Sequence, residues 1–272
     1  SWSREMADTY HEYMADVLAG AFVTSGKIKK LCAKLKARGD TYKRWHYDQE
    51  KANRAIRFIE SFCCQTSGEI GQKLVLQPFQ KFIISAVFGW VDDEGNREFQ
   101  EVLVIMGRKG GKTVLAAAIM QYLMVADGEY GPQIYTMACT DSQAALCFGG
   151  AKKMMKQSPA LKRRERMGTV PERRRQGILH EANDGFITTL TMSTELDGLD
   201  VHGAVCVELH RQELVLHGGI GVGDGGLDGG RLLLDGEGAV ADAVGLHLHL
   251  HLKAVDVAGL TEAILGEGVG EL

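Results

Sequence analysis

Residues 102–120 read VLVIMGRKGGKTVLAAAIM, and the interpretation of the whole chain begins from them. The apolar run before the glycines predicts a buried strand, and the second apolar run predicts a helix that begins at the glycine block. A phosphate-binding loop requires this context, because its glycines turn backbone N–H groups toward phosphate oxygens and the helix N-terminus adds partial positive charge. The spacing departs from a strict Gly-x-x-x-x-Gly-Lys-Ser/Thr loop, since Met106 stands where the first glycine is expected and Gly107 follows it.

The glycine block therefore predicts a site for ATP and Mg²⁺. The Lys112 ammonium would reach the β- and γ-phosphates, and the Thr113 hydroxyl would ligate Mg²⁺. Phosphate binding alone does not require two further cations in the loop. An arginine there either stabilises charge that develops on the γ-phosphate or is a solvated loop charge. The predicted phosphate-binding residues are Gly107, Arg108, Lys109, Gly110, Gly111, Lys112 and Thr113.

A catalytic carboxylate is expected at the end of a second buried strand. Residues 201–209, VHGAVCVEL, predict such a strand and offer Glu208 as the group that activates the attacking water. A P-loop ATPase normally has Asp-Glu at this point, with the aspartate holding Mg²⁺ through water. Val207 occupies the aspartate position, so the predicted Mg²⁺ site lacks one carboxylate. Asp197 and Asp200 precede the strand and are expected to point elsewhere.

Two further features are candidates for binding. Gln80, in the segment LQPFQ, has a side-chain amide that could pair with the adenine edge, although a place on a helix surface is the simpler interpretation. Residues 152–175 contain ten cations and two acids. This segment is either a contact surface for the phosphates of DNA or RNA or a solvated helix–loop face.

Strands alternate with helices through the middle of the chain, which predicts an α/β fold with a mainly parallel sheet flanked by helices. Residues 1–70 predict an N-terminal helical region, and residues 71–210 predict an incomplete P-loop ATPase domain. The expected helices are 27–39, 48–63, 76–90, 113–127 and 141–159, and the expected strands are 100–106, 132–140, 185–193 and 201–209.

Residues 211–272 have a different composition from the rest of the chain. They contain 15 glycines and no aromatic residue, proline, serine or asparagine, and their formal charge is −7 against +3 for residues 1–210. We expect an irregular, disordered tail, and we hypothesise that it is the product of a shifted reading frame, which the other frames of the coding DNA would test. The run HLHLHL would place His247, His249 and His251 on one strand face as candidate metal ligands, but no carboxylate or cysteine is placed around it.

The overall composition is ordinary for a globular protein, with 45% hydrophobic and 24% charged residues among 272. No apolar stretch approaches the ~20 residues of a membrane span. The N-terminus lacks the pattern of a secretion signal. The six cysteines show no ligand spacing, which predicts reduced thiols packed as small hydrophobes.

Taken in order, these blocks resemble the large terminase subunit of tailed bacteriophages over about residues 42–210. The resemblance rests on YDQEKANRAIRFIE, LQPFQKFIISAVFGW, GRKGGKT, TDSQAALCFGGAKKMMKQSPAL and LDGLDVHGAVCVELH. It implies a RecA-like ATPase domain that drives double-stranded DNA into a capsid, with portal protein and small terminase subunit as partners. It also implies a ring of subunits in an intact motor, located in the cytoplasm of the bacterial host and transiently at the procapsid portal. Arg108 and Lys109 match an arginine-lysine pair in the family's loop, which favours a catalytic role for Arg108.

The departures from the family define the alternatives. Val207 replaces the family's aspartate, and nothing after residue 210 matches the family or its nuclease domain. We expect a truncated ATPase part without a nuclease, and the sequence leaves open whether it hydrolyses ATP. The alternatives are a non-catalytic prophage remnant that at most binds nucleotide or DNA, and a helicase-like P-loop enzyme, against which the flanking blocks argue.

Overall fold

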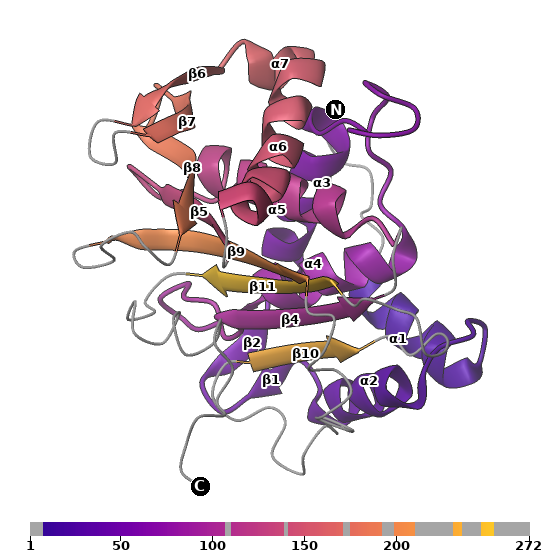
Figure 1. The fold of residues 1–272 in the computed structure, drawn as a ribbon. Helices are drawn as coiled ribbons and strands as arrows, with labels where there is room; N and C mark the ends of the chain where they lie inside the picture. The colour runs from indigo at the N-terminus through magenta and orange to yellow at the C-terminus, as the bar shows by residue number, and fades with distance from the viewer. Residues whose placement is uncertain are drawn as a thin grey trace, which may run out of the picture.

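Helices cover an eight-stranded mixed sheet, and a second sheet of three short strands lies beside the N-terminal helices (Figure 1). The structure is a computed structural model. It describes residues 8–106, 110–138, 141–170, 175–191, 199–209, 231–235 and 246–252. For residues 105, 106, 138, 141, 143, 191, 206–209 and the last two segments it describes the backbone path alone.

The large sheet has the strand order β10-β4-β11-β9-β5-β8-β7-β6. Strands β7 and β11 run opposite to the other six, so the sheet is mixed, with most of its strands parallel. The strand bounds are β4 Glu101–Met106, β5 Gln133–Ala138, β6 Glu165–Val170, β7 Arg175–His180, β8 Gly185–Thr191, β9 Val201–Leu209, β10 Arg231–Asp235 and β11 Leu246–Leu252. The small sheet joins β1 Thr41–Tyr42, β2 Trp45–Tyr47 and β3 Trp90–Val91.

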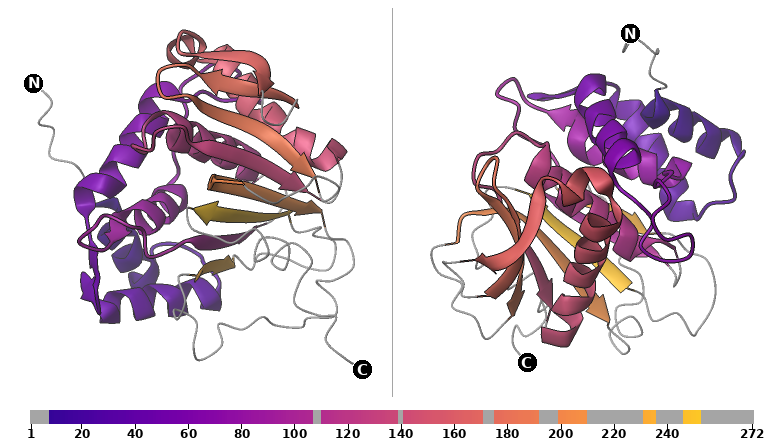
Figure 2. Two further views of the ribbon diagram at one scale, coloured as in Figure 1. Left: turned by 90° about the vertical axis from the view of Figure 1, so that its left-hand side faces the viewer. Right: turned by 90° about the horizontal axis from the view of Figure 1, so that it is seen from above.

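The helices form successive layers on the sheet. Helices α5 and α6 contact its central strands, α3 packs on α5, α4 packs on α3, and α1 packs on α4. Helix α2 packs on α1 and contacts the edge strand β10. Both views in Figure 2 show the N-terminal helices gathered to one side of the sheet. The helix bounds are α1 Thr9–Ala19, α2 Gly26–Arg38, α3 Gln49–Phe62, α4 Pro78–Gly89, α5 Lys112–Val125, α6 Asp141–Gln157 and α7 Pro159–Lys162.

Local sequence explains where several helices begin and end. The Asp48 side chain accepts a hydrogen bond from the Lys51 N–H at 3.0 Å and caps α3. Pro78 stands at the first position of α4, where its missing N–H costs nothing. The five predicted helices and the four predicted strands are all present, with ends that differ from the expected ranges by a few residues.

Two segments of the C-terminal tail are strands, so the expectation of an irregular tail is wrong for them. Strand β11 lies antiparallel between β4 and β9, and β10 pairs parallel with β4. Composition missed them because a strand needs backbone partners more than it needs a particular side-chain pattern, and β4 and β9 supply those partners. The hypothesis of a shifted reading frame stays a prediction, and the rest of the tail lies outside the described residues.

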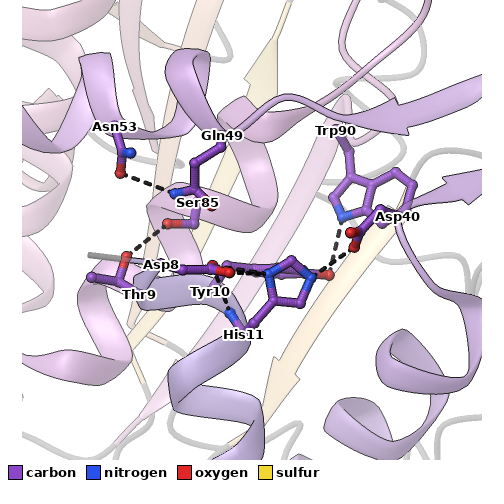
Figure 3. Close-up of polar contacts among 9 residues, drawn as sticks. All are labelled: Asp8, Thr9, Tyr10, His11, Asp40, Gln49, Asn53, Ser85 and Trp90. Carbon is purple, nitrogen blue, oxygen red and sulfur yellow. Dashed lines mark hydrogen bonds and ion pairs between the residues drawn. The ribbon is translucent and has the colours of Figure 1, made fainter. Parts of the chain in front are cut away.

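The N-terminal helices are attached to the rest of the chain by polar contacts as well as by apolar packing (Figure 3). The Trp90 indole N–H donates to the Tyr10 hydroxyl at 3.0 Å, in a buried contact between α1 and β3. The His11 ring lies between Asp8 and Asp40, with nitrogen–oxygen distances of 2.7 Å to each carboxylate. Burial lowers the pKa of His11, but hydrogen bonds to both carboxylates outweigh it and the net pKa is raised.

One cluster of buried apolar side chains runs from Tyr10 in α1 to Val205 in β9. Helices α1–α3 therefore share a core with the sheet. The boundary near residue 70 between a helical region and an ATPase domain stays a prediction. The cysteines at 32, 63, 64 and 147 are buried and free, as the spacing predicted. Within the described ranges, no helix combines the length and apolar character that crossing a bilayer requires.

Candidate functional site

The glycine block lies where β4 ends and α5 begins. Residues 107–109 are outside the described ranges, so the predicted roles of Gly107, Arg108 and Lys109 stay predictions. Gly110 and Gly111 form the turn into α5, and Gly111 has φ 81° and ψ 12°. This left-handed conformation strains any residue with a Cβ atom, which explains why a glycine directly precedes the lysine.

Lys112 begins α5 and is buried, with 5% of its surface exposed. Burial lowers the pKa of its ammonium, because removal from water disfavours the charged form. An anionic ligand at the turn would have the opposite effect and favour the charged form. Thr113 follows in the first helical turn and is exposed, so its hydroxyl is accessible to a metal ion or ligand.

Gln80 reaches the same turn from α4. Its Oε1 atom accepts a hydrogen bond from the Gln77 N–H at 2.9 Å, which fixes the amide, and its Nε2 atom lies 3.2 Å from the position that a Cβ of residue 111 would occupy. Gln80 is 5% exposed, so the simpler expectation of a helix-surface role is wrong. The structure thus brings Gln80, Gly111 and Lys112 together from two elements.

The register of the sheet places Glu208 on the same edge. Strands β4 and β9 are parallel to each other, with β11 between them. Glu208 is opposite His247 of β11, which is opposite Ile105, one residue before the end of β4. The backbone of Glu208 is therefore level with the end of the strand that enters the glycine turn, about 10 Å away across two strand spacings.

The described residues fit a nucleotide phosphate at this edge. The space beside Gly111 is one that a Cβ would fill, and the buried Lys112 begins the helix whose N-terminal N–H groups can donate hydrogen bonds to an anion. Thr113 supplies a hydroxyl oxygen of the kind that Mg²⁺ prefers. Within the described side chains, no group of three histidine, cysteine or acidic residues is arranged to hold a metal ion. The side chains of His247, His249 and His251 lie outside that description.

The basic segment predicted at residues 152–175 lies on α6, α7, β6 and the start of β7. Its acid Glu165 is buried at 5% exposure and contributes nothing to the surface charge. Residues 171–174 are outside the described ranges. The exposed charged side chains of the described part are therefore all cationic: Lys153, Lys156, Lys162, Arg163, Arg164 and Arg166.

A buried charge cluster at the other end of α5 was not predicted from the sequence. Arg97 Nη1 lies 2.9 and 2.8 Å from the two carboxylate oxygens of Asp127, and His202 Nε2 lies 2.8 Å from one of them. Burial raises the pKa of Asp127, but the two partners outweigh it and lower the net pKa. The three residues are far apart in sequence and share no motif, so no local signal could have grouped them.

The geometry defines an α/β protein with a strand, a glycine turn and a buried lysine at the carboxyl edge of its sheet. The family described as "Terminase large subunit, ATPase domain" matches residues 78–214, which is half of the chain. The chain belongs to this terminase large subunit family.

Similar proteins come from bacteriophages. The large terminase subunit of Enterobacteria phage HK97 is 36% identical over 113 residues, which cover 41% of this chain and 21% of that protein. The terminase large subunits of Lactococcus phages p2 and SK1 are each 25% identical over 125 residues, which cover 44% of this chain and 23% of those proteins. The matched segment thus spans less than a quarter of each relative.

Among solved structures, the HK97 bacteriophage large terminase is similar to this chain with a TM-score of 0.49 and 26% sequence identity. The likeness covers 71% of this chain and 39% of that one.

Proposed function

We propose that this chain carries the nucleotide-binding part of a DNA-packaging ATPase, with a RecA-like P-loop fold. The observation that carries the proposal is the meeting of Gln80, Gly111 and Lys112 inside the segment that matches the terminase ATPase family. ATP with Mg²⁺ would supply the phosphoryl group whose transfer to water drives the motor.

The roles follow from where the residues lie. Backbone N–H groups of the 107–111 loop and the Lys112 ammonium would bind the phosphates, and Thr113 would ligate Mg²⁺. The Arg108 guanidinium would stabilise charge on the γ-phosphate, and the Glu208 carboxylate would orient and deprotonate the attacking water. Gln80 would hold the glycine turn and offer its amide to the adenine base.

Val207 favours a second candidate function, a remnant that binds nucleotide with little hydrolysis. A valine neither coordinates Mg²⁺ nor accepts a proton, so the position where the family has aspartate contributes nothing to the metal site. We therefore expect binding without efficient turnover.

Double-stranded DNA is the proposed partner of the exposed cations on α6, α7 and β6. Lys and Arg side chains that contact phosphates release counterions from DNA, and binding of this kind weakens as salt rises. In the intact motor, the portal protein, the small terminase subunit and neighbouring copies in a ring would be further partners, in the host cytoplasm and at the procapsid portal.

Nucleotide titration of Lys112→Ala tests the proposal. The parent chain should bind a fluorescent ATP analogue weakly in the presence of Mg²⁺, and the variant should lose at least about tenfold in affinity, because a charge-assisted contact to phosphate is removed. Lys153→Ala, an exposed lysine on α6, is the matched control and should bind as the parent does.

Phosphate release separates the two candidate functions. We expect little hydrolysis from the parent chain and a gain from Val207→Asp, which restores the missing carboxylate. Robust Mg²⁺-dependent hydrolysis by the parent, lost in Glu208→Ala, would refute the remnant. If Lys112→Ala bound ATP with the same affinity as the parent, both candidate functions would be refuted.

A further inference from the structure

A small pocket lies at the end of α5 away from the glycine turn. It has a volume of about 80 Å³ and is lined by residues of α3, the β3 turn and the end of α5, among them Lys51, Arg54, Arg97 and Tyr122. Helix α5 has 14 residues and rises about 1.5 Å per residue, so about 20 Å separate this pocket from Lys112. The pocket is therefore a different place from the nucleotide site.

The side chains that line the pocket carry a surplus of positive charge. Lys51 and Arg54 are three residues apart on α3 and so face the same side of the helix. Arg97 is the third cation, and Asp127 is the acid among the lining residues. Asp127 bonds both Arg97 and His202, so the one acid of the lining has its nearest partners elsewhere than Lys51 and Arg54.

Two nearby acids are engaged with other groups. Glu50, next to Lys51, pairs with Arg57 on the outer side of α3. Asp92 accepts hydrogen bonds from the backbone and side chain of Asn96, at 2.8 and 3.1 Å. The Lys51 ammonium lies 3.4 Å from the carbonyl oxygen of Gly95, another lining residue, and an ammonium has three protons to donate.

Tyr122 adds a neutral donor. Burial raises the pKa of its phenol, and Arg54 and Arg97 are near enough to oppose that rise by their charge. The hydroxyl is therefore protonated at neutral pH and can donate a hydrogen bond. Phe88 and Val91 form apolar parts of the wall, which exclude water and strengthen the attraction of an anion to the cations.

The size of the pocket suits one compact anion. A single water occupies about 10–15 Å³ of cavity space, so about 80 Å³ holds several waters or one tetrahedral oxyanion. We propose that this pocket binds one phosphate-class oxyanion through Lys51, Arg54 and the Tyr122 hydroxyl. The anion is either a phosphodiester of the DNA backbone or free inorganic phosphate.

Titration with inorganic phosphate tests the pocket by itself. The Lys112→Ala chain is used throughout, without nucleotide, so that phosphate binding at the glycine turn contributes nothing. In this background Lys51→Gln/Arg54→Gln should weaken phosphate binding at least about tenfold, because two charge-assisted contacts are lost. Arg57→Gln, one turn along α3 and paired with Glu50, is the matched control and should not weaken it.

Duplex DNA then distinguishes the two sources of the anion. Anisotropy of a short labelled duplex is measured between about 50 and 200 mM NaCl. If the ligand is a phosphodiester, Lys51→Gln/Arg54→Gln should lower the slope of log DNA affinity against log salt concentration by about 1. Arg163→Gln, on the exposed basic surface, should lower this slope by the same amount. If the slope is unchanged while phosphate binding is lost, the ligand is free phosphate.

If Lys51→Gln/Arg54→Gln changed neither the phosphate affinity nor the salt slope, the proposal that the pocket binds an anion would be overturned. A change in self-association alone, measured by sedimentation, would also overturn it, because the cations would then meet an acidic surface of a second copy. None of these readouts depends on nucleotide binding or hydrolysis, so the pocket and the proposed function can fail independently. Circular dichroism verifies that each variant folds, as expected for the changes at exposed or half-buried Lys51, Arg54, Arg57 and Arg163. The Lys112→Ala chain, whose change is at a buried position, is the reference for all of them.

Discussion

Helix α5 has a buried ionisable group at each end, and the surroundings disfavour the charged form at one end and favour it at the other. At its start, burial lowers the pKa of Lys112 and so disfavours the charged form. Just beyond its other end, Arg97 and His202 outweigh burial and hold Asp127 in its charged form. Asp127 is held charged by two partners from distant segments, which ties it to stability, and the position of Lys112 beside a glycine turn suits it to an anionic ligand.

A third polar position lies between the two ends. Glu165 of β6 is buried beside Gln121 of α5, and neither of its carboxyl oxygens has a hydrogen-bond partner within the described part of the chain. Burial raises its pKa to about 8, and the Gln121 amide opposes that rise. Burial therefore sets the direction of the pKa shift at Glu165, as it does at Lys112, and disfavours the charged form of both side chains. Three variants along α5 test whether this comparison holds.

Asp127→Asn should have the largest effect on stability. Removing the charge leaves Arg97 buried without its counter-ion, which costs about 3–5 kcal/mol of unfolding free energy for buried pairs of this kind. Urea denaturation at neutral pH measures the loss. The exposed carboxylate Asp184, which accepts a hydrogen bond from Tyr130, provides the control Asp184→Asn, expected to change stability little. If Asp127→Asn lost no more than that control, the buried cluster would not be a stabilising one.

Glu165→Gln should have an intermediate effect of opposite sign. Because the pKa of Glu165 is raised on folding, the parent chain loses stability as pH rises from the unfolded pKa, about 4.3, to the folded pKa of about 8. Glutamine has no such titration, so the variant should be more stable above pH 8, by about 1–3 kcal/mol. Urea midpoints at pH 5 and above pH 8 measure the difference. A gain that does not grow with pH would contradict a neutral Glu165 in the fold.

Lys112→Met should have the smallest effect. Methionine has a similar length and no charge to bury, so in the absence of nucleotide the unfolding free energy should change by less than about 1 kcal/mol. ATP should raise the stability of the parent chain by mass action and leave the variant unchanged. Urea denaturation with and without Mg²⁺-ATP measures both effects. If Lys112→Met without ligand lost as much unfolding free energy as Asp127→Asn, Lys112 would be a structural cation like Arg97.

Much of the fold follows from short stretches of sequence. Capping by Asp48, the proline that opens α4 and the glycines before α5 are local signals, because they act on backbone groups within one turn. The apolar runs of β4, β5, β8 and β9 are equally local. The strand–glycine turn–helix unit and its lysine could therefore be predicted, as could membership in the terminase family.

Contacts between distant segments could not be predicted in this way. The capping contact from Gln77 aims the Gln80 amide at Gly111, and no spacing along the chain encodes that meeting. The same holds for the cluster of Arg97, Asp127 and His202, and for the cations around the small pocket. Strands β10 and β11 are the strongest case: the alternation of HLHLHL fits a strand, but nothing in the tail indicated that it would pair between β4 and β9, or that β10 would pair with β4.

The amino-acid sequence by itself determined the family, the glycine turn with its lysine, and most helices and strands, because propensity, capping and apolar period act over a few residues. Tertiary structure decided which buried charges are compensated and which tail segments become strands. Those outcomes depend on the partners that distant segments supply, since both the cost of burying a charge and the pairing of a strand are set by what lies beside it.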